Sequence, residues 1–416
     1  MWQISQHDKS ILRKLAEKKA ALALLPIQQQ RIEMWKKLNG LKKVKPLVLI
    51  KPSEIPWHEI GIFSQLETTG EFARKLELEL RQLLYMWENL QCDMVIENKM
   101  TCQMVVYESG FGFEEVSDKL HTAPGSIASR HFQPQIKSEK DIEKIKTPMV
   151  SLDKEATLIK FEIMQDVFGD ILPVELYGAK MFWFVPWDYL VTLWGAQELL
   201  LDMAMRPEMV KAVIDKMVNA QLSRLEQWEK LNALSLNNDG TIFGSGGYCF
   251  TDELPKKDFN NAHVRAADTW GSCAAQIFSE VSPQMHMEFA IDFEVKWLSQ
   301  FGLTTYGCCE PLHNKIGILK KIPNLRRISV SPWANFEKAV SEIKSNYVIS
   351  YKPNPAVFAF DKWDSDTVAK ELREKLKTAQ DCCIEIIMKD VSTIKNDPAR
   401  LTDWAKIAWR IAEEFA

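Results

Sequence analysis

Two adjacent cysteines followed by a glutamate are the part of this sequence best suited to chemistry. Cys308, Cys309 and Glu310 end the short apolar run LTTYGCCE. A thiolate joined by imidazole or carboxylate in an open site suits Zn²⁺, which needs three protein ligands. If the run is a regular strand, successive side chains alternate, so only one thiol would face a site. The alternative is two buried thiols beside a solvated acid, because free cysteines are often core residues.

A histidine and a second glutamate precede this run on a predicted helix. Ser282 and Pro283 are typical of a helix start, since serine caps the first turn and proline suits its first position. His286 and Glu288 then fall in the first two turns, on the rim where the following strand ends. An ordinary capping or packing histidine is the alternative. A second cysteine pair, at 382–383, begins a later strand and is interpreted as core.

Short apolar runs alternate with helical patterns along the chain. Eight segments are predicted to contain strands: 45–54, 101–109, 171–180, 233–240, 303–310, 325–332, 346–353 and 382–390. Helical patterns separate them, and a last helix begins after the cap Asp397. Eight strands separated by helices predict an α/β fold of the (β/α)₈ barrel type over residues 46–416. Residues 1–45, with a helical pattern over about 7–40, are expected to form an N-terminal helical arm.

Polar side chains follow nearly every predicted strand. The catalytic groups of such barrels lie at the C-terminal ends of the strands, so these side chains would converge on one mouth. They are Lys51, Glu54, Glu108, Tyr177, Lys180, Asn237, Asn238, Asp239, Ser331, Trp333, Lys352, Asn354, Lys389 and Asp390. The alternative is that strands end in polar residues simply because loops are polar.

A long connection from Asp239 to Ser282 holds the glycine-rich stretch FGSGGYCFTDELP. It lacks the Gly-Lys-Ser/Thr of a phosphate-binding loop. We expect a flexible wall or lid over the pocket, with Asp252 and Glu253 as substrate contacts. An ordinary surface excursion is the alternative.

Composition excludes several classes of function. The 416 residues are 46% hydrophobic and 26% charged, which is typical of a globular protein and not of a disordered one. A formal charge of −4 gives no basic surface for nucleic acid. No apolar run is long enough to span a membrane. The charged N-terminus is unlike a secretory signal, and the eight scattered cysteines are no disulfide framework, so a reduced, cytoplasmic protein is expected.

Four segments carry a resemblance to a known group. SEVSPQMHMEF, FGLTTYGCCEPL, LRRISVSPWAN and YVISYKPNPA resemble the uroporphyrinogen decarboxylase-like superfamily, in a branch near the corrinoid-dependent methyltransferases. The resemblance covers residues 230–416 well and is weak before about 150. It implies a (β/α)₈ barrel and a homodimer. It also implies one of two activities: decarboxylation without a cofactor, or zinc-dependent methyl transfer through a corrinoid protein.

At the positions that distinguish those two activities, this sequence departs from the motifs of both groups. The decarboxylases carry an arginine-rich segment after the first strand. Here that segment is IKPSEIPWHEIG, which contains no arginine. The zinc methyltransferases carry His-x-Cys and a further cysteine near the last strand. Here Cys309 falls on the motif cysteine, Gly307 replaces the histidine, and Lys389–Asp390 ends the last strand. Zinc would then be bound by Cys309, or less readily Cys308, with ligands drawn from His286, Glu288, Glu310 and Asp390.

Three classes of function follow. The leading prediction is a zinc-dependent methyltransferase that moves a methyl group from an aryl methyl ether or methylamine to the cobalt of a separate corrinoid protein. The second is a metal-free decarboxylase or lyase that uses Asp239 or Glu253 with Lys180 and Lys352. The third is a non-catalytic binding barrel. The catalytic candidates are Glu310, Asp239 and Glu253, and the substrate-binding candidates are Glu54, Tyr177, Asn238, Trp333, Lys352 and Asn354.

Overall fold

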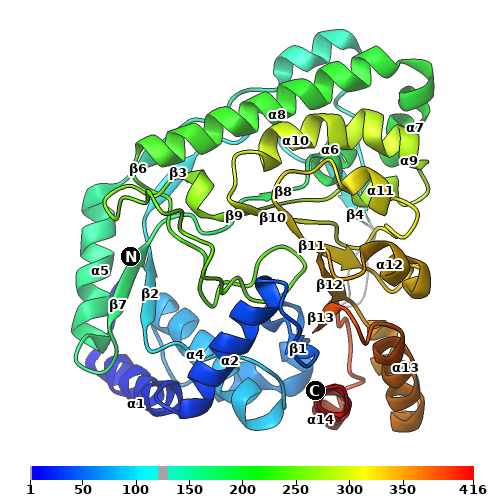
Figure 1. Ribbon diagram of the computed structural model, residues 1–416. Coiled ribbons are helices and arrows are strands. Elements are labelled where there is room, and N and C mark those ends of the chain that lie inside the picture. The colour runs from blue at the N-terminus through cyan, green and yellow to red at the C-terminus, as the bar shows by residue number, and fades with distance from the viewer. Residues whose placement is uncertain (1, 120–129) are drawn as a thin grey trace.

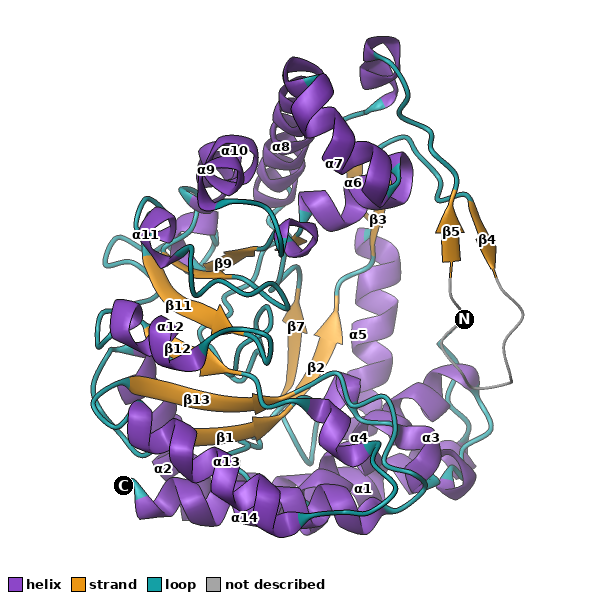
Figure 2. Ribbon diagram, turned by 90° about the vertical axis from the view of Figure 1, so that its right-hand side faces the viewer, coloured by secondary structure: helices purple, strands orange, loops and turns teal. Residues whose placement is uncertain are grey.

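The computed structural model, which describes residues 2–119 and 130–416, has a curved parallel sheet at its centre (Figure 1). Seven strands pair in the order β1 (Leu47–Ile50), β13 (Cys383–Met388), β12 (Val348–Tyr351), β11 (Leu325–Val330), β10 (Leu303–Tyr306), β9 (Trp270–Cys273) and β8 (Trp183–Phe184). A second parallel pair, β2 (Met100–Gln103) with β7 (Val174–Tyr177), forms another part of the wall (Figure 2). The strands together form a barrel-like ring, which confirms the predicted α/β fold.

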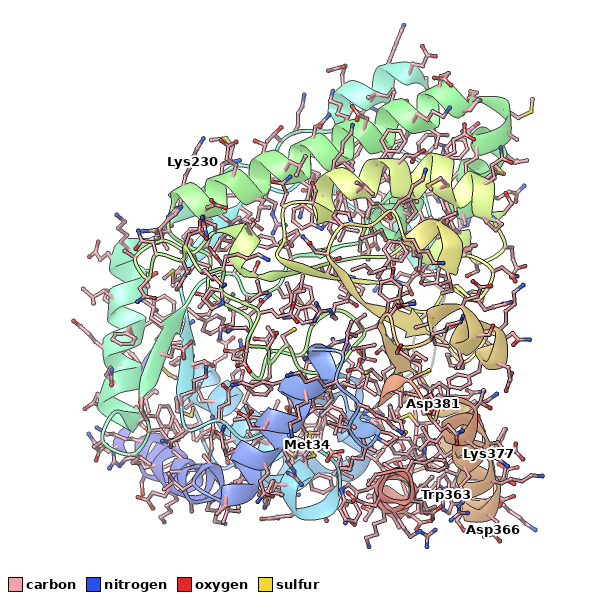
Figure 3. All side chains as sticks on the ribbon, in the orientation of Figure 1. Met34, Lys230, Trp363, Asp366, Lys377 and Asp381 are labelled. Atoms are coloured by element: carbon pink, nitrogen blue, oxygen red, sulfur yellow. The ribbon has the colours of Figure 1, made fainter. Side chains whose placement is uncertain are left out.

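Helices surround this ring. They are α1 (Gln6–Ala23), α2 (Pro26–Asn39), α3 (Trp57–Ile60), α4 (Glu71–Asn89), α5 (Lys154–Phe168), α6 (Pro186–Trp194), α7 (Ala196–Met205), α8 (Pro207–Lys230), α9 (Pro283–His286), α10 (Asp292–Leu298), α11 (Ile316–Leu319), α12 (Phe336–Ile343), α13 (Ser365–Thr378) and α14 (Pro398–Glu414). Two antiparallel pairs lie outside the sheet: β3 (Val106–Glu108) with β6 (Val150–Leu152), and β4 (Ser117–Lys119) with β5 (Arg130–Phe132). Charged side chains such as Lys230 and Lys377 point outward (Figure 3).

The best-predicted elements have strong local signals. Strands β1 and β13 are buried along their whole length, and strands covered on both faces are almost continuously apolar. The side chain of Ser282 accepts a hydrogen bond from the backbone of Met285, and Asp397 accepts one from Ala399. Both predicted helix starts are therefore confirmed. The helical arm is divided into α1 and α2, because Pro26 starts a new helix.

The fourth predicted strand is wrong. Segment 233–240 makes only one isolated bridge, between Leu234 and Ala179. Strand β10 pairs on one side with β11 and on the other with β9, which lies inside the connection that was expected to be a loop. Its four residues, WGSC, form no continuous apolar run. A Cβ atom at Gly271 would overlap the Phe301 ring, so this strand is defined by close packing and not by an apolar pattern.

The glycine-rich stretch is not a lid. Residues 243–251 are buried, and the segment lies inside the ring of strands (Figure 1). Ser245 donates to the carbonyl of Gly307 at 2.9 Å, and the backbone N–H of Gly247 donates to Glu385 at 3.0 Å. Arg327 donates to the carbonyl of Tyr248 at 2.9 Å. Since these partners lie on or just beyond β10, β11 and β13, the segment fills the space that strand side chains fill in a regular barrel.

A glycine substitution tests this packing. In Gly246→Ala the new Cβ would lie 2.6 Å from Cδ of Arg327 and 2.9 Å from Oε1 of Glu385. We expect a loss of about 1–3 kcal/mol of stability, measured as a lower urea midpoint. Gly317→Ala is the control, because that helical position has nothing within 4 Å of the new atom. Equal midpoints for the two variants would contradict the buried packing.

Candidate functional site

Two thiols, an ammonium and a carboxylate gather where β10 and β13 end. The sulfurs of Cys308 and Cys309 are 3.6 Å apart. Nζ of Lys389 lies 3.6 Å from the first sulfur, 3.7 Å from the second and 2.6 Å from Oδ2 of Asp390. We call these four residues the thiol–ammonium cluster. It lies at the C-terminal ends of parallel strands, which is where barrels carry their chemistry.

Both thiols face the same way, which corrects the expectation that they would alternate. Strand β10 ends at Tyr306, and Gly307 has a φ of 94°, so the alternation stops before the cysteines. A glycine is required there, because this φ disfavours other residues and a Cβ would lie 2.5 Å from Cδ1 of Leu312. One left-handed residue therefore brings two neighbouring sulfurs to a single ammonium.

Glu310 holds the turn that carries the thiols. Its fully buried carboxylate accepts hydrogen bonds from the backbone N–H of Cys308 at 2.9 Å and of Ala275 at 3.2 Å. Burial raises the pKa of Glu310 to about 7. Because both oxygens are used by backbone groups, this residue acts on the site by positioning Cys308.

The other side of the cluster is tied to the first strand. The backbone N–H of Asp390 donates to Oε2 of Glu54 at 2.8 Å, and Glu54 forms a 2.6 Å ion pair with Lys51. Lys51 in turn donates to the carbonyl of Gly244 at 3.2 Å. Glu54, predicted as a substrate contact, thus supports the cluster from the turn that follows β1.

The charges of the cluster favour one thiolate. The hydrogen bond from Cys308, together with the nearby Lys389, lowers the pKa of Cys309 to about 7 against the effect of burial. The same hydrogen bond and burial raise the pKa of Cys308. Although burial opposes it, the charge of the thiol pair and the bond to Asp390 raise the pKa of Lys389. Near neutral pH the cluster therefore holds an ammonium, a carboxylate and a Cys309 thiol that is about half ionised.

The structure does not bring His286 or Glu288 to the cluster. His286 is fully buried, with Nε2 2.9 Å from the hydroxyl of Tyr306, which donates to Glu294 at 2.8 Å. Burial lowers the pKa of His286 to about 3, so the ring is neutral. Glu288 forms an ion pair with Lys211 at 2.8 Å. Within residues 2–119 and 130–416, no three His, Cys, Asp or Glu side chains are arranged to hold a metal ion.

The cluster as arranged does not fit a zinc ion. Two thiols and a carboxylate are donors that zinc accepts. Their shared neighbour, however, is the Lys389 ammonium, and a second cation could approach them only if that side chain moved away. Glu310 is held by backbone groups instead. The predicted zinc site therefore stays a prediction that requires Lys389 to leave its place.

A separate cavity of about 500 Å³ is lined by other predicted residues. Its lining includes Tyr177, Lys180 and Asp239. Asp239 Oδ2 accepts hydrogen bonds from Lys180 at 2.5 Å and from Lys99 at 3.1 Å. Burial opposes ionisation, but these two lysines lower the pKa of Asp239. The sequence showed no signal for Lys99, which precedes a short strand and reaches the site only through folding.

The remaining predicted residues are dispersed. Glu253 pairs with Arg326 at 2.8 Å, and Asn238 donates to the carbonyl of Leu254 at 2.7 Å. Lys352 is buried and donates to the hydroxyl of Ser350 at 2.6 Å, and burial lowers its pKa to about 7. The side chain of Asn354 accepts from the backbone of Ala356, and Trp333 is 68% exposed. None of these five lines the cavity.

Comparison with known proteins gives a likeness of fold. No protein-family model and no curated protein matches the sequence. Among solved structures, a methyltransferase from Methanosarcina mazei matches with a TM-score of 0.51 and 10% identity, over 92% of this chain and 97% of that chain. At this identity the match shows the fold alone, an α/β barrel. No helix in the described part of the chain is long and apolar enough to cross a membrane.

The ionisation of the cluster can be tested by thiol reactivity. We expect iodoacetamide to alkylate Cys309 with a midpoint near pH 7. Lys389→Met should raise that midpoint by about 1–2 pH units, because the ammonium that favours the thiolate is gone. Lys362→Met, at an exposed position, is the control. A midpoint that does not change in Lys389→Met would contradict the ion pair.

Metal analysis tests the place of Lys389. We expect wild-type protein purified with zinc to hold little metal, and Lys389→Ala to gain roughly one zinc per chain, since it frees two thiols and a carboxylate. Adding Cys309→Ala to that variant should remove the gained zinc. Stoichiometric zinc in the wild type, lost in Cys309→Ala, would show instead that Lys389 moves aside.

Proposed function

We propose that this chain is a methyltransferase that takes a methyl group from a small aryl methyl ether or methylamine. The acceptor in this proposal is the cobalt of a separate corrinoid protein. The thiol–ammonium cluster at the strand ends is the observation that carries the proposal. The likeness to a methyltransferase barrel supports it as an analogy of fold.

Lys389 would act on the group that leaves. When the acceptor's electron pair forms the new bond to the methyl carbon, the pair of the broken bond stays on the substrate oxygen or nitrogen. A fixed ammonium stabilises that developing charge by hydrogen bonding and proximity. The Cys309 thiolate and Asp390 keep Lys389 protonated, since both raise the cost of losing its proton.

Access to the cluster agrees with an acceptor carried on another protein. The side chain of Asp390 is 53% exposed, and Cys309 is partly exposed, whereas Lys389 and Cys308 are buried beneath them. A substrate held over Cys309 would thus meet the ammonium on one side and solvent on the other. The open side is the one from which a bulky acceptor could approach.

A second candidate is a metal-free decarboxylase or lyase that uses the cavity. The observation that favours it is the meeting of Asp239 with Lys99 and Lys180. An ionised Asp239 would destabilise a substrate carboxylate placed beside it, and a lysine could then protonate the carbanion left after loss of carbon dioxide. Among the described residues that line the cavity, the cations are Lys19, Lys99 and Lys180, so a substrate carboxylate would be held there by ammonium groups.

The two candidate functions differ in which variants they predict to lose activity. Methyl transfer is followed by the absorbance change of cob(I)alamin with methoxybenzoates and methylamines, and decarboxylation by release of carbon dioxide from carboxylates. For the methyltransferase we expect Lys389→Met to lose about 10²–10³-fold in rate, with Lys99→Met close to wild type. Release of carbon dioxide that depends on Lys99 and not on Lys389 would establish the second candidate and overturn the first.

A further inference from the structure

We infer that Cys308 and Cys309 are a redox modification site, in which the two neighbouring thiols form a reversible disulfide with each other. Their sulfurs are already 3.6 Å apart and need to approach to about 2 Å. Gly307 turns both side chains to one side, so no strand geometry has to be broken. This disulfide would form whether or not the chain transfers methyl groups.

The bond would be easy to reduce again. Consecutive Cα atoms are about 3.8 Å apart, which is shorter than the separation of about 4.4–6.8 Å usual in disulfides. A strained disulfide has a higher reduction potential than a relaxed one, and bonds of that kind are the labile and regulatory ones. The closed form is therefore expected under oxidising conditions and the open form in a reducing cell.

The two thiols have different roles in the reaction. The oxidant is a small disulfide such as oxidised glutathione. The Cys309 thiolate attacks one of its sulfurs and releases a thiolate, which leaves a mixed disulfide on Cys309. Cys308 then gives its proton to the released glutathione thiolate. The Cys308 thiolate formed in this way attacks the Cys309 sulfur and displaces the second glutathione thiolate. The protein pair loses two electrons, and the external disulfide gains them as it becomes one thiol and one thiolate.

The surroundings select Cys309 as the thiol attacked first. It is partly exposed, whereas the other seven cysteines are buried. Lys389 lies 3.7 Å from its sulfur and favours the thiolate, which is the reactive form. Oxidation would remove that thiolate and leave Lys389 with Asp390 as its remaining ionised partner in the cluster. The modification would therefore change the charge beside the proposed leaving group.

The chain contains its own control pair. Cys382 and Cys383 are also adjacent, but both are buried where the regular strand β13 begins. Side chains alternate along a strand, so these two sulfurs point to opposite faces. A disulfide that forms at 308–309 and not at 382–383 would therefore show that the turn at Gly307 is needed, since both pairs are adjacent in sequence.

The full-length protein is treated with oxidised glutathione and analysed by intact mass and peptide mapping. We expect the wild type to lose two hydrogens, placed on the peptide with Cys308 and Cys309 and restored by dithiothreitol. Cys308→Ser should retain glutathione on Cys309, because the second attack is missing. Cys309→Ser should react at least about tenfold more slowly. The double variant Cys382→Ser/Cys383→Ser should behave as the wild type.

Other products overturn the inference. Persistent glutathione on the wild type would show that Cys308 cannot complete the exchange. Equal oxidation at 382–383, or disulfides between two chains, would show that the geometry at Gly307 has no part in it. Circular dichroism of each variant before oxidation shows that the fold is intact, so that a slow reaction reports the missing thiol.

Discussion

A buried ion pair between Arg327 and Glu385 is the interaction on which the rest of the structure depends. Both side chains are fully buried, and Nε of Arg327 lies 3.4 Å from Oε1 of Glu385. Charges taken out of water are costly unless they find further hydrogen bonds. The glycine-rich segment provides these, since Gly247 donates to Glu385 and two of the segment's carbonyls accept from Arg327. The pair therefore requires the segment inside the ring, and the segment requires glycines to fit.

That segment also determines how the two polar regions are related. It leaves the cavity at Thr241 and Ile242, which are part of the cavity lining, and its next residues approach the strand ends that carry the cluster. Ser245 donates to the carbonyl of Gly307, directly before the two thiols. Lys51 joins the same segment to Glu54, which holds Asp390. Cluster and cavity thus have a shared wall, and a change in its packing would reach both.

The cluster illustrates how a lysine can take the place of another cation. Thiols and a carboxylate around one centre are a donor set that a metal would accept, and Lys389 occupies that position with its own charge. An ammonium differs from a metal because it donates hydrogen bonds and accepts no further ligands. It can stabilise charge on a neighbouring atom without binding that atom. It also leaves the thiols free to react, whereas a thiolate bound to a metal ion is held as a ligand.

The sequence by itself determined the elements with strong local signals. Long apolar runs defined β1 and β11–β13, and capping residues defined the starts of α9 and α14, because burial and capping depend on neighbours in the chain. The barrel-like order followed from their alternation. The sequence also singled out Asp239 and Lys180, and these two side chains meet in the cavity although the segment that ends at Asp239 is not a strand.

Only the tertiary structure decided which polar residues lie together. Strand β9 has no continuous apolar run, and its Gly271 leaves room for the Phe301 ring, which a Cβ atom would overlap. A single left-handed residue, Gly307, turned both thiols toward Lys389, whereas a regular strand would have separated them. His286 followed a correctly predicted helix start, yet its side chain turned to Tyr306. Local patterns report burial and turns, but the direction of a side chain depends on packing between segments far apart in the chain.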